Sequence, residues 1–237
     1  MDALSRAVEV PHLELPETRE PEPNPVTIGL DVGQRVDPTA ICVAEREDRQ
    51  HIEQVRTPYG PGAVMIEERT STEDHYLIRH LERLPLGLSY PAVARRVRDV
   101  AAGIRSRTRG SYPSLYVDAT GVGTPLIDVL REVGVEANII AVYFTHGDRM
   151  TQAEGSEIRL GKAYLVSRLQ TLLQGGRLHL PKTQEAQQLA RELLDYEIHV
   201  DQNANDTYGA FKVGSHDDLV TALGLAVCER QGVTWVW

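Results

Sequence analysis

The stretch TIGLDVGQRVDPTAICVAERE, residues 27–47, predicts a β-hairpin whose first strand ends on an acidic residue. Ile28 and Leu30 fall on one face of that strand and Asp31 falls on the other, because successive side chains of a strand point to opposite faces. Aspartate is a poor strand residue, so its position needs an explanation. It is either a turn residue, with Gly33 completing the turn, or a functional carboxylate.

A second aspartate occupies the same kind of position in SLYVDATGVG, residues 114–123. Asp118 ends an apolar strand and precedes a glycine-containing turn, and ligands of open α/β sheets bind just past the carboxyl ends of strands. The structural alternative is that Asp118 caps the next helix. Thr124 fits that role better, because Pro125 follows it at the first helical position. We therefore expect Asp118 to be functional.

Two adjacent aspartates open the last predicted helix, SHDDLVTALGLAVC, residues 215–228. Ser215 is a good N-cap, and an aspartate in the first turn complements the helix dipole, so one aspartate has a structural explanation. Two aspartates directly after His216 are harder to explain in this way. The later turns are apolar and must lie on the sheet, which would bring Asp217 or Asp218 towards the ends of the strands.

Carboxylates that converge in one place repel one another unless cations neutralise them. Hard divalent cations prefer such oxygen ligands, and two ions about 4 Å apart form the arrangement that cleaves phosphodiesters. The two cysteines are far apart in the sequence and no HExxH pattern occurs, so no site for a softer metal competes. We expect two Mg²⁺ or Mn²⁺ ions. The expected metal-binding and catalytic residues are Asp31, Asp118, Asp217 and Asp218.

The composition is that of a globular protein with an acidic surface. The 237 residues carry a formal net charge of −9, which argues against a general nucleic-acid coat protein but allows an enzyme with a local basic groove. No window approaches 18 apolar residues and no apolar run resembles a signal peptide, so we expect no membrane association. The two cysteines have apolar neighbours and are expected to be buried, reduced thiols in an intracellular protein.

The hydrophobic pattern predicts one α/β domain, residues 26–237, preceded by a flexible arm or linker rich in proline and glutamate, residues 1–25. Strands dominate early and strand–helix alternation follows, so the sheet should mix antiparallel and parallel strands. The polar segment 145–159 is long enough for a hairpin or loop. Strands are expected at 26–33, 39–47, 51–59, 75–85, 114–118 and 137–144, and helices at 89–110, 124–134, 161–176, 183–196 and 215–230.

Three motifs, GLDVG, VDATGVG and HDDLVTALGLA, together resemble the nuclease domain of the large terminase subunits of tailed bacteriophages, over roughly residues 26–229. The resemblance implies a ribonuclease H-like fold, with a five-stranded central sheet flanked by helices. It also implies a metal-dependent endonuclease that cuts concatemeric double-stranded DNA by two-metal-ion hydrolysis. The first, second and third metal-binding aspartates of the family fall on Asp31, Asp118 and Asp217.

Further site residues are suggested by the same resemblance and by the charge pattern. Asp37 and His216 are accessory candidates, although Asp-Pro is also an ordinary turn opener. Lys162 matches a family lysine that could contact the scissile phosphate; a surface lysine is the alternative. The basic helix 89–110 could contact DNA phosphates or be a solvated face. The expected DNA-binding residues are Arg95, Arg98, Arg105, Arg149, Arg159 and Lys162.

One part of a packaging terminase is missing from the sequence. No GxxxxGK[ST] motif occurs, so we expect the ATPase to lie outside this chain. The expected partners are double-stranded DNA, a packaging ATPase domain, the portal and the small terminase, in the cytoplasm of the infected bacterial host. Three other hypotheses stay open. They are a Holliday-junction resolvase or transposase-like nuclease of the same fold, an actin-like ATPase, and a non-enzymatic docking module.

Overall fold

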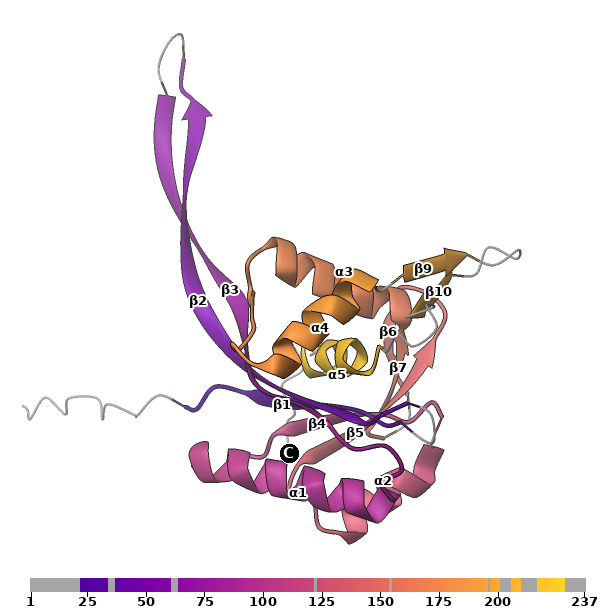
Figure 1. Ribbon diagram of the computed structural model, residues 1–237. Helices are drawn as coiled ribbons and strands as arrows, with labels where there is room; N and C mark the ends of the chain where they lie inside the picture. Colours follow the sequence, from indigo (N-terminus) through magenta and orange to yellow (C-terminus); the bar gives the residue numbers. More distant parts are fainter. Residues whose placement is uncertain are drawn as a thin grey trace, which may run out of the picture.

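One mixed β-sheet organises the chain, and helices cover both of its faces (Figure 1). The computed structural model describes residues 22–33, 37–60, 64–121, 123–153, 155–195, 197–200, 206–209 and 217–228. In these residues the sheet has eight strands in the order β6–β7–β5–β4–β1–β2–β3–β8, and β9 and β10 form a separate pair.

The main-sheet strands are β1 (Val26–Asp31), β2 (Ala40–Pro58), β3 (Val64–Arg83), β4 (Ser114–Asp118), β5 (Asn138–Thr145), β6 (Met150–Gln152), β7 (Glu157–Gly161) and β8 (Leu178–His179). The separate pair is β9 (Glu197–Val200) and β10 (Asp206–Gly209). The helices are α1 (Tyr90–Arg107), α2 (Gly123–Glu132), α3 (Lys162–Gln174), α4 (Gln184–Asp195) and α5 (Asp218–Ala226).

The prediction of a mixed α/β sheet is confirmed, but the expected number of five strands is too small. Strands β3, β2, β1, β4 and β5 form the centre of the sheet. Strands β7 and β6 extend the β5 edge, and the two-residue strand β8 extends the β3 edge. These three strands are at most five residues long, too short for a clear alternating pattern in the sequence.

Strand β1 lies at the centre of the sheet, antiparallel to β2 and parallel to β4. Ile28 and Leu30 are fully buried in the apolar cluster that α1 and α2 share with one face of the sheet. Gly29 faces α5 on the other side. The predicted alternation of faces in this strand is therefore confirmed. Helices α3 and α4 lie on the same side as α5 (Figure 1).

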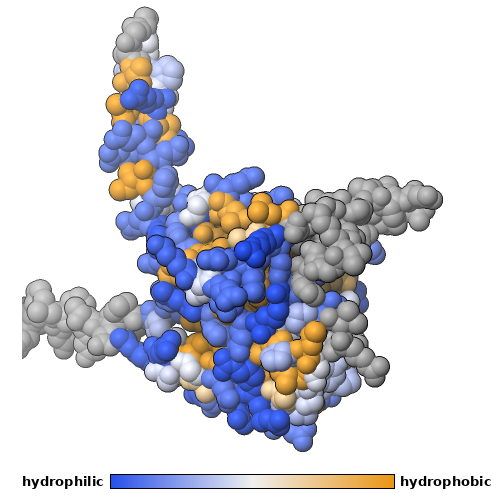
Figure 2. Space-filling model, viewed as in Figure 1, coloured by the Kyte–Doolittle hydropathy of each residue, from blue (hydrophilic) through white to orange (hydrophobic). Residues whose placement is uncertain are grey.

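Strands β2 and β3 are far longer than predicted and form a hairpin that projects from the body (Figure 1). The sequence predicts separate strands at 39–47, 51–59 and 75–85, because the polar residues between them have no apolar face. The structure pairs them continuously from Ala40 with Arg83 to Pro58 with Val64. Figure 2 shows a mostly hydrophilic surface along this hairpin, interrupted by apolar patches. The exposed apolar side chains of the hairpin include Ile52, Val64 and Ile66.

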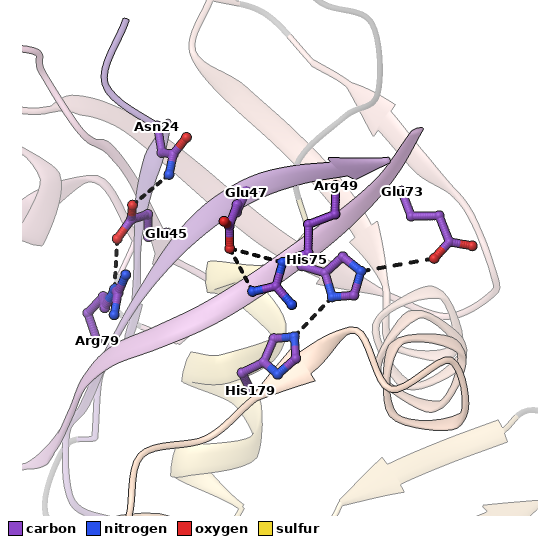
Figure 3. A network of polar contacts seen from close by, with 8 residues as sticks. All are labelled: Asn24, Glu45, Glu47, Arg49, Glu73, His75, Arg79 and His179. Carbon is purple, nitrogen blue, oxygen red and sulfur yellow. Dashed lines mark hydrogen bonds and ion pairs between the residues drawn. The ribbon is translucent and has the colours of Figure 1, made fainter. Parts of the chain in front are cut away.

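A polar network holds the base of the hairpin to the body (Figure 3). Nδ1 of His75 in β3 lies 2.9 Å from Nε2 of His179 in β8, and the two rings stack. On the neighbouring strand, Glu45 accepts hydrogen bonds from Arg79 at 2.7 Å and from Asn24 at 2.8 Å. The hairpin is therefore tied both to β8 and to the segment that leads into β1.

Two helix starts differ from the predictions. Helix α2 begins at Gly123, so the expectation that Thr124 is its N-cap is wrong. Pro125 is tolerated inside the first turn, because the N–H groups there have no intrahelical partner. Helix α5 begins at Asp218 with Asp217 as N-cap, so the expected cap at Ser215, which lies outside the described residues, is also wrong.

The expectation that both cysteines are buried is confirmed, and neither forms a disulfide. None of the helices in the described part of the chain is long and apolar enough to cross a membrane.

We expect Gly29→Ala to lower the free energy of unfolding by about 3 kcal/mol or more, because overpacking a rigid contact is costly. A Cβ at this position would lie 2.0 Å from the carbonyl oxygen of Ala222 and 2.6 Å from the amide nitrogen of Ala226, both in the α5 backbone. Urea unfolding monitored by circular dichroism measures the effect.

Gly103→Ala is the matched control. Gly103 lies within α1, with nothing within 4 Å of an added Cβ. The substitution should stabilise the protein by about 0.5–1 kcal/mol, because alanine is the better helix residue. Equal effects of the two substitutions would contradict the proposed close contact between β1 and α5.

Candidate metal centre

An acidic cavity of about 420 Å³ lies where β1 and β4 end and α5 begins. Its acidic residues come from three separate parts of the chain, and one lysine adds a positive charge. The residues that line it are Asp31, Val32, Gly33, Asp37, Asp118, Gly121, Phe144, Lys162, Asp217, Asp218 and Thr221. The structure thus brings together all four aspartates that the sequence singles out.

Asp31 and Asp118 are neighbours because they end neighbouring parallel strands. Leu30 in β1 is in register with Val117 in β4, so the next residue of each strand reaches the same edge. The turn after β4 fixes Asp118, whose Oδ1 accepts the Thr120 N–H at 2.9 Å. The Thr120 hydroxyl in turn accepts the Phe144 N–H at 2.8 Å. Asp118 therefore accepts a hydrogen bond within its own turn, which fixes its carboxylate.

Asp217 and Asp218 have different surroundings although they are adjacent. Asp217 is partly buried at the N-cap of α5, where its side chain makes no capping hydrogen bond. Asp218 is almost fully buried, and Arg83 donates to both of its oxygens, at 2.7 Å from Nε and 3.2 Å from Nη2. A cation in the cavity would have to compete with this guanidinium for the Asp218 carboxylate.

The cavity disfavours negative charge in the absence of a cation. Burial raises the pKa of Asp31 well above its ordinary value, and the charges of Asp118, Asp217 and Asp218 raise it further. Burial also raises the pKa of Asp118, with opposing contributions from the hydrogen bonds of Thr120 and from Lys162. Lys162 alone does not offset this repulsion, so the site favours an additional positive charge.

The donor set fits a hard divalent cation. In the described part of the chain, no three His, Cys, Asp or Glu side chains are already grouped tightly enough to hold an ion. The acidic groups that line the cavity are nevertheless carboxylates, and the described lining residues include no thiol or imidazole. Oxygen-only donors with room for water suit Mg²⁺ or Mn²⁺. Asp31, Asp118 and Asp217 are the residues that could hold such ions.

Lys162 lies in the wall of the cavity, at the start of α3. Its ammonium group is 5.6 Å from the centroid of the Phe144 ring, within the range of a cation–π contact. Its positive charge opposes the rise in the pKa of Asp31 and in the pKa of Asp118, but does not cancel it. Asp37 lines the cavity at an exposed position, whereas His216 lies outside the described residues.

The arginines predicted on the basic helix do not reach the cavity. Arg95, Arg98 and Arg105 belong to α1, on the opposite face of the sheet from α5 (Figure 1). Arg98 pairs with Asp99 at 3.2 Å, and Arg105 pairs with Glu136. Their contact with DNA stays a prediction, on a surface separate from the acidic cavity.

The predicted hairpin in segment 145–159 is confirmed as β6 and β7, and β7 ends at Gly161, directly before Lys162 of the cavity wall. The Gly161 N–H donates to the carbonyl oxygen of Arg149 at 2.8 Å, which places the Arg149 backbone beside the residue before Lys162. The Arg149 and Arg159 side chains are exposed. The backbone of Arg149, one of the predicted DNA-binding arginines, therefore lies beside the start of α3.

Several residues of the site are missing from the sequence-based prediction. Thr120 could have been found from the DATG motif, because an aspartate often accepts the N–H two residues later. Thr221 lies one turn after Asp217, whose carbonyl accepts the Thr221 N–H at 2.8 Å. No local sequence pattern identifies Arg83 or Glu192 as site residues. Arg83, for example, contacts Asp218, which lies 135 positions later in the sequence.

The strand order β3–β2–β1–β4–β5, with carboxylates at the ends of β1 and β4, defines the class of ribonuclease H-like α/β proteins. The profile of the terminase RNase H-like domain matches residues 28–230. The chain therefore belongs to this family of terminase nuclease domains. The actin-like ATPase hypothesis loses its support.

Solved structures agree with this assignment at the level of the fold. The large terminase nuclease of the thermophilic phage G20c matches with a TM-score of 0.54 and 19% identity, over 88% of this chain and 83% of that one. The same nuclease with bound magnesium gives a TM-score of 0.53 and 20% identity, over 87% and 82%. The Mn-soaked human cytomegalovirus terminase nuclease domain gives 0.51 and 12%, over 85% and 81%. No curated protein sequence matches the chain.

We expect Asp31→Asn to raise the stability of the metal-free protein at neutral pH. Folding raises the pKa of Asp31, so the wild-type protein loses stability as the pH rises from the unfolded pKa through the folded one. Asparagine does not titrate, so the gain should be small near about pH 4 and grow towards about pH 7. Urea unfolding in EDTA at both pH values measures it.

Asp99→Asn, at an exposed position on α1, is the control and should change stability by less than about 0.5 kcal/mol. If Asp31→Asn were less stable than the wild type at neutral pH without metal, the Asp31 carboxylate would not be repelled by its surroundings.

Proposed function

We propose that the chain is a metal-dependent endodeoxyribonuclease that cuts concatemeric double-stranded DNA during viral genome packaging. The observation that carries the proposal is the convergence of Asp31, Asp118 and Asp217 in one cavity at the strand ends. The family assignment supports the reaction class. The magnesium bound in the phage G20c nuclease supports the kind of metal.

Asp31, Asp118 and Asp217 are the residues that would hold two Mg²⁺ or Mn²⁺ ions. Asp31 would help to hold both ions, one together with Asp217 and the other together with Asp118. When bound, such a pair of ions activates a water molecule and stabilises the leaving 3′ oxygen of a cleaved phosphodiester. The hydrogen bond from Thr120 to Asp118 would keep that carboxylate in place.

Lys162 is the residue of the cavity that suits a DNA phosphate. Its ammonium group is the single positive charge among the lining residues that the structure describes, and it lies over the Phe144 ring. A fixed ammonium group can hold a phosphate and stabilise the negative charge that develops on it. Asp37, at the exposed rim, would be an accessory carboxylate.

The surroundings of the cavity suit a nuclease that recognises DNA by its backbone. The β6–β7 hairpin and Arg149 adjoin the start of α3, so they could guide a strand towards Lys162. Among the described residues that line the cavity there is no asparagine, glutamine or arginine that would read base edges. We propose that cleavage has little sequence preference. A packaging ATPase, portal and small terminase would then deliver the DNA, in the cytoplasm of the bacterial host.

We expect purified protein to cleave supercoiled plasmid in Mn²⁺ or Mg²⁺ and to leave it intact in EDTA. Asp31→Asn, Asp118→Asn and Asp217→Asn should each lower the rate at least about a hundredfold, because losing a metal ligand removes several kcal/mol of transition-state stabilisation. Gel electrophoresis of the plasmid over time measures the rate.

Asp128→Asn, an exposed aspartate on α2, is the control and should keep the wild-type rate. Cleavage by the wild-type protein that survives EDTA, or equal cleavage by wild type and Asp31→Asn, would refute the metal-dependent mechanism. Faster cleavage of four-way junctions than of linear duplex would instead favour the resolvase hypothesis.

We expect Lys162→Ala to lower the rate of plasmid cleavage about 10- to 100-fold, the loss of one hydrogen bond to a charged group. Binding of Mn²⁺ should persist, since the carboxylates remain. Lys182→Ala, which removes an exposed lysine away from the cavity, should leave the rate unchanged. Equal rates for Lys162→Ala and the wild type would exclude a role of Lys162 at the phosphate.

A further inference from the structure

Three charged residues, one from each of three elements, meet at the edge of the acidic cavity, which Asp218 lines. Arg83 is the last residue of β3, Glu192 lies in α4 and Asp218 is the first residue of α5. The side chains of Asp218 and Glu192 are only 3% and 9% exposed. Buried charges are costly unless they are paired and hydrogen-bonded, so this group has to be satisfied internally.

Arg83 satisfies both carboxylates. Its Nε lies 2.7 Å from Oδ2 of Asp218, its Nη2 lies 3.2 Å from Oδ1, and Nη2 also pairs with Glu192. The two hydrogen bonds from Arg83 engage both oxygens of Asp218. The arginine stays positively charged at any ordinary pH. A divalent cation bound to Asp218 would therefore lie against a permanent positive charge.

Glu192 holds the backbone of α5 at the same point. Its Oε2 accepts the Leu219 N–H at 3.1 Å, and this N–H is one of the first four of the helix, which lack intrahelical partners. An N-cap side chain usually fills that role, but Asp217 makes no capping bond. A carboxylate from α4 thus stabilises the start of α5 in place of its own N-cap residue.

The register of the sheet connects this group to Asp31. Arg83 pairs with Ala40, and Ala40 pairs with Asp31, so the three residues lie in one row across β3, β2 and β1. Paired residues point to the same face of a sheet, here the face that α5 covers. Two strand spacings, about 10 Å, separate Arg83 from Asp31 along this row. Arg83 therefore holds α5 to the row of the sheet that carries Asp31.

We propose that Arg83, Asp218 and Glu192 form an anchor that positions Asp217 against Asp31 and Asp118, and that Asp218 is a positioning residue and not a metal ligand. This inference rests on the proposed metal-dependent nuclease function. It assigns different roles to the two adjacent aspartates of the HDD motif. Asp217 binds metal because its carboxylate is not used to start the helix, and Asp218 fixes where Asp217 lies.

The test compares Mn²⁺ binding, by isothermal titration calorimetry, with the Mn²⁺ dependence of plasmid cleavage. Asp217→Asn should lose Mn²⁺ binding at the site and cleavage at every Mn²⁺ concentration. Asp218→Asn and Glu192→Gln are close in shape to the residues they replace, so the fold should survive. Both should still bind Mn²⁺, with the half-saturating concentration raised about 3- to 30-fold and the rate at saturation within about threefold of the wild type.

Arg83 is tested by two substitutions of different severity. Arg83→Lys keeps the charge without the fork and should bind Mn²⁺ more tightly than Arg83→Met, which leaves two buried carboxylates unpaired. If Arg83→Met does not fold, circular dichroism will show it, and Asp218→Asn and Glu192→Gln still decide the question. Glu82→Gln is the matched control: Glu82 precedes Arg83 in β3 and pairs with Arg96 and His80. Its Mn²⁺ half-saturation should equal that of the wild type.

Three results would overturn the anchor. A folded Asp218→Asn that loses Mn²⁺ binding as completely as Asp217→Asn would make Asp218 a direct ligand. If Asp218→Asn and Glu192→Gln both kept the wild-type half-saturating Mn²⁺ concentration, the anchor residues would have no positioning role. If the half-saturating Mn²⁺ concentration rose as much in Glu82→Gln as in Glu192→Gln, the rise would reflect general destabilisation of the protein. A wild-type protein that neither binds Mn²⁺ nor cleaves DNA would refute the proposed function itself, and the anchor with it.

Discussion

The direct contact between the backbones of β1 and α5 at Gly29 is the constraint on which the site depends. Any side chain at Gly29 would overlap Ala222 and Ala226, so the helix can lie on the strand only because glycine is there. A second small residue continues the arrangement, because Gly224 of α5 receives the side chain of Leu165 from α3. Asp217 precedes α5 and Lys162 begins α3. Two close contacts therefore place residues from distant parts of the sequence around one cavity.

Electrostatics then divides the acidic residues into two groups. Asp218 and Glu192 are both paired with Arg83, which engages both oxygens of Asp218. The charges of Asp31, Asp118 and Asp217 face the cavity, and burial together with mutual repulsion raises the pKa of Asp31 and of Asp118. Such a site weakens the metal-free protein and favours bound cations. Stability without metal and affinity for metal are thus opposed at the same residues.

The strand-end aspartates are predictable from the sequence because period-two alternation identifies the strand, its buried face and the residue that ends it. The expectation that α5 brings a carboxylate to Asp31 follows from its apolar later turns, and the structure agrees. The length of the β2–β3 hairpin is not predictable, because its outer half has no buried face. The roles of Arg83 and Glu192 are not predictable either, because their partners in α5 are remote in the sequence. Both Asp217 and Asp218 line the cavity, and local patterns cannot show which of them is paired with Arg83.

The most direct test of the central claim is an anomalous difference map from a crystal of this protein soaked in Mn²⁺. The account predicts peaks in the cavity within bonding distance of Asp31, Asp118 and Asp217, with Asp218 still bound to Arg83. No peak in the cavity, in a crystal where the metal has reached the protein surface, would contradict a metal centre formed by these strand ends. A peak bonded to Asp218, with the Arg83 contact broken, would contradict the roles assigned to the two adjacent aspartates.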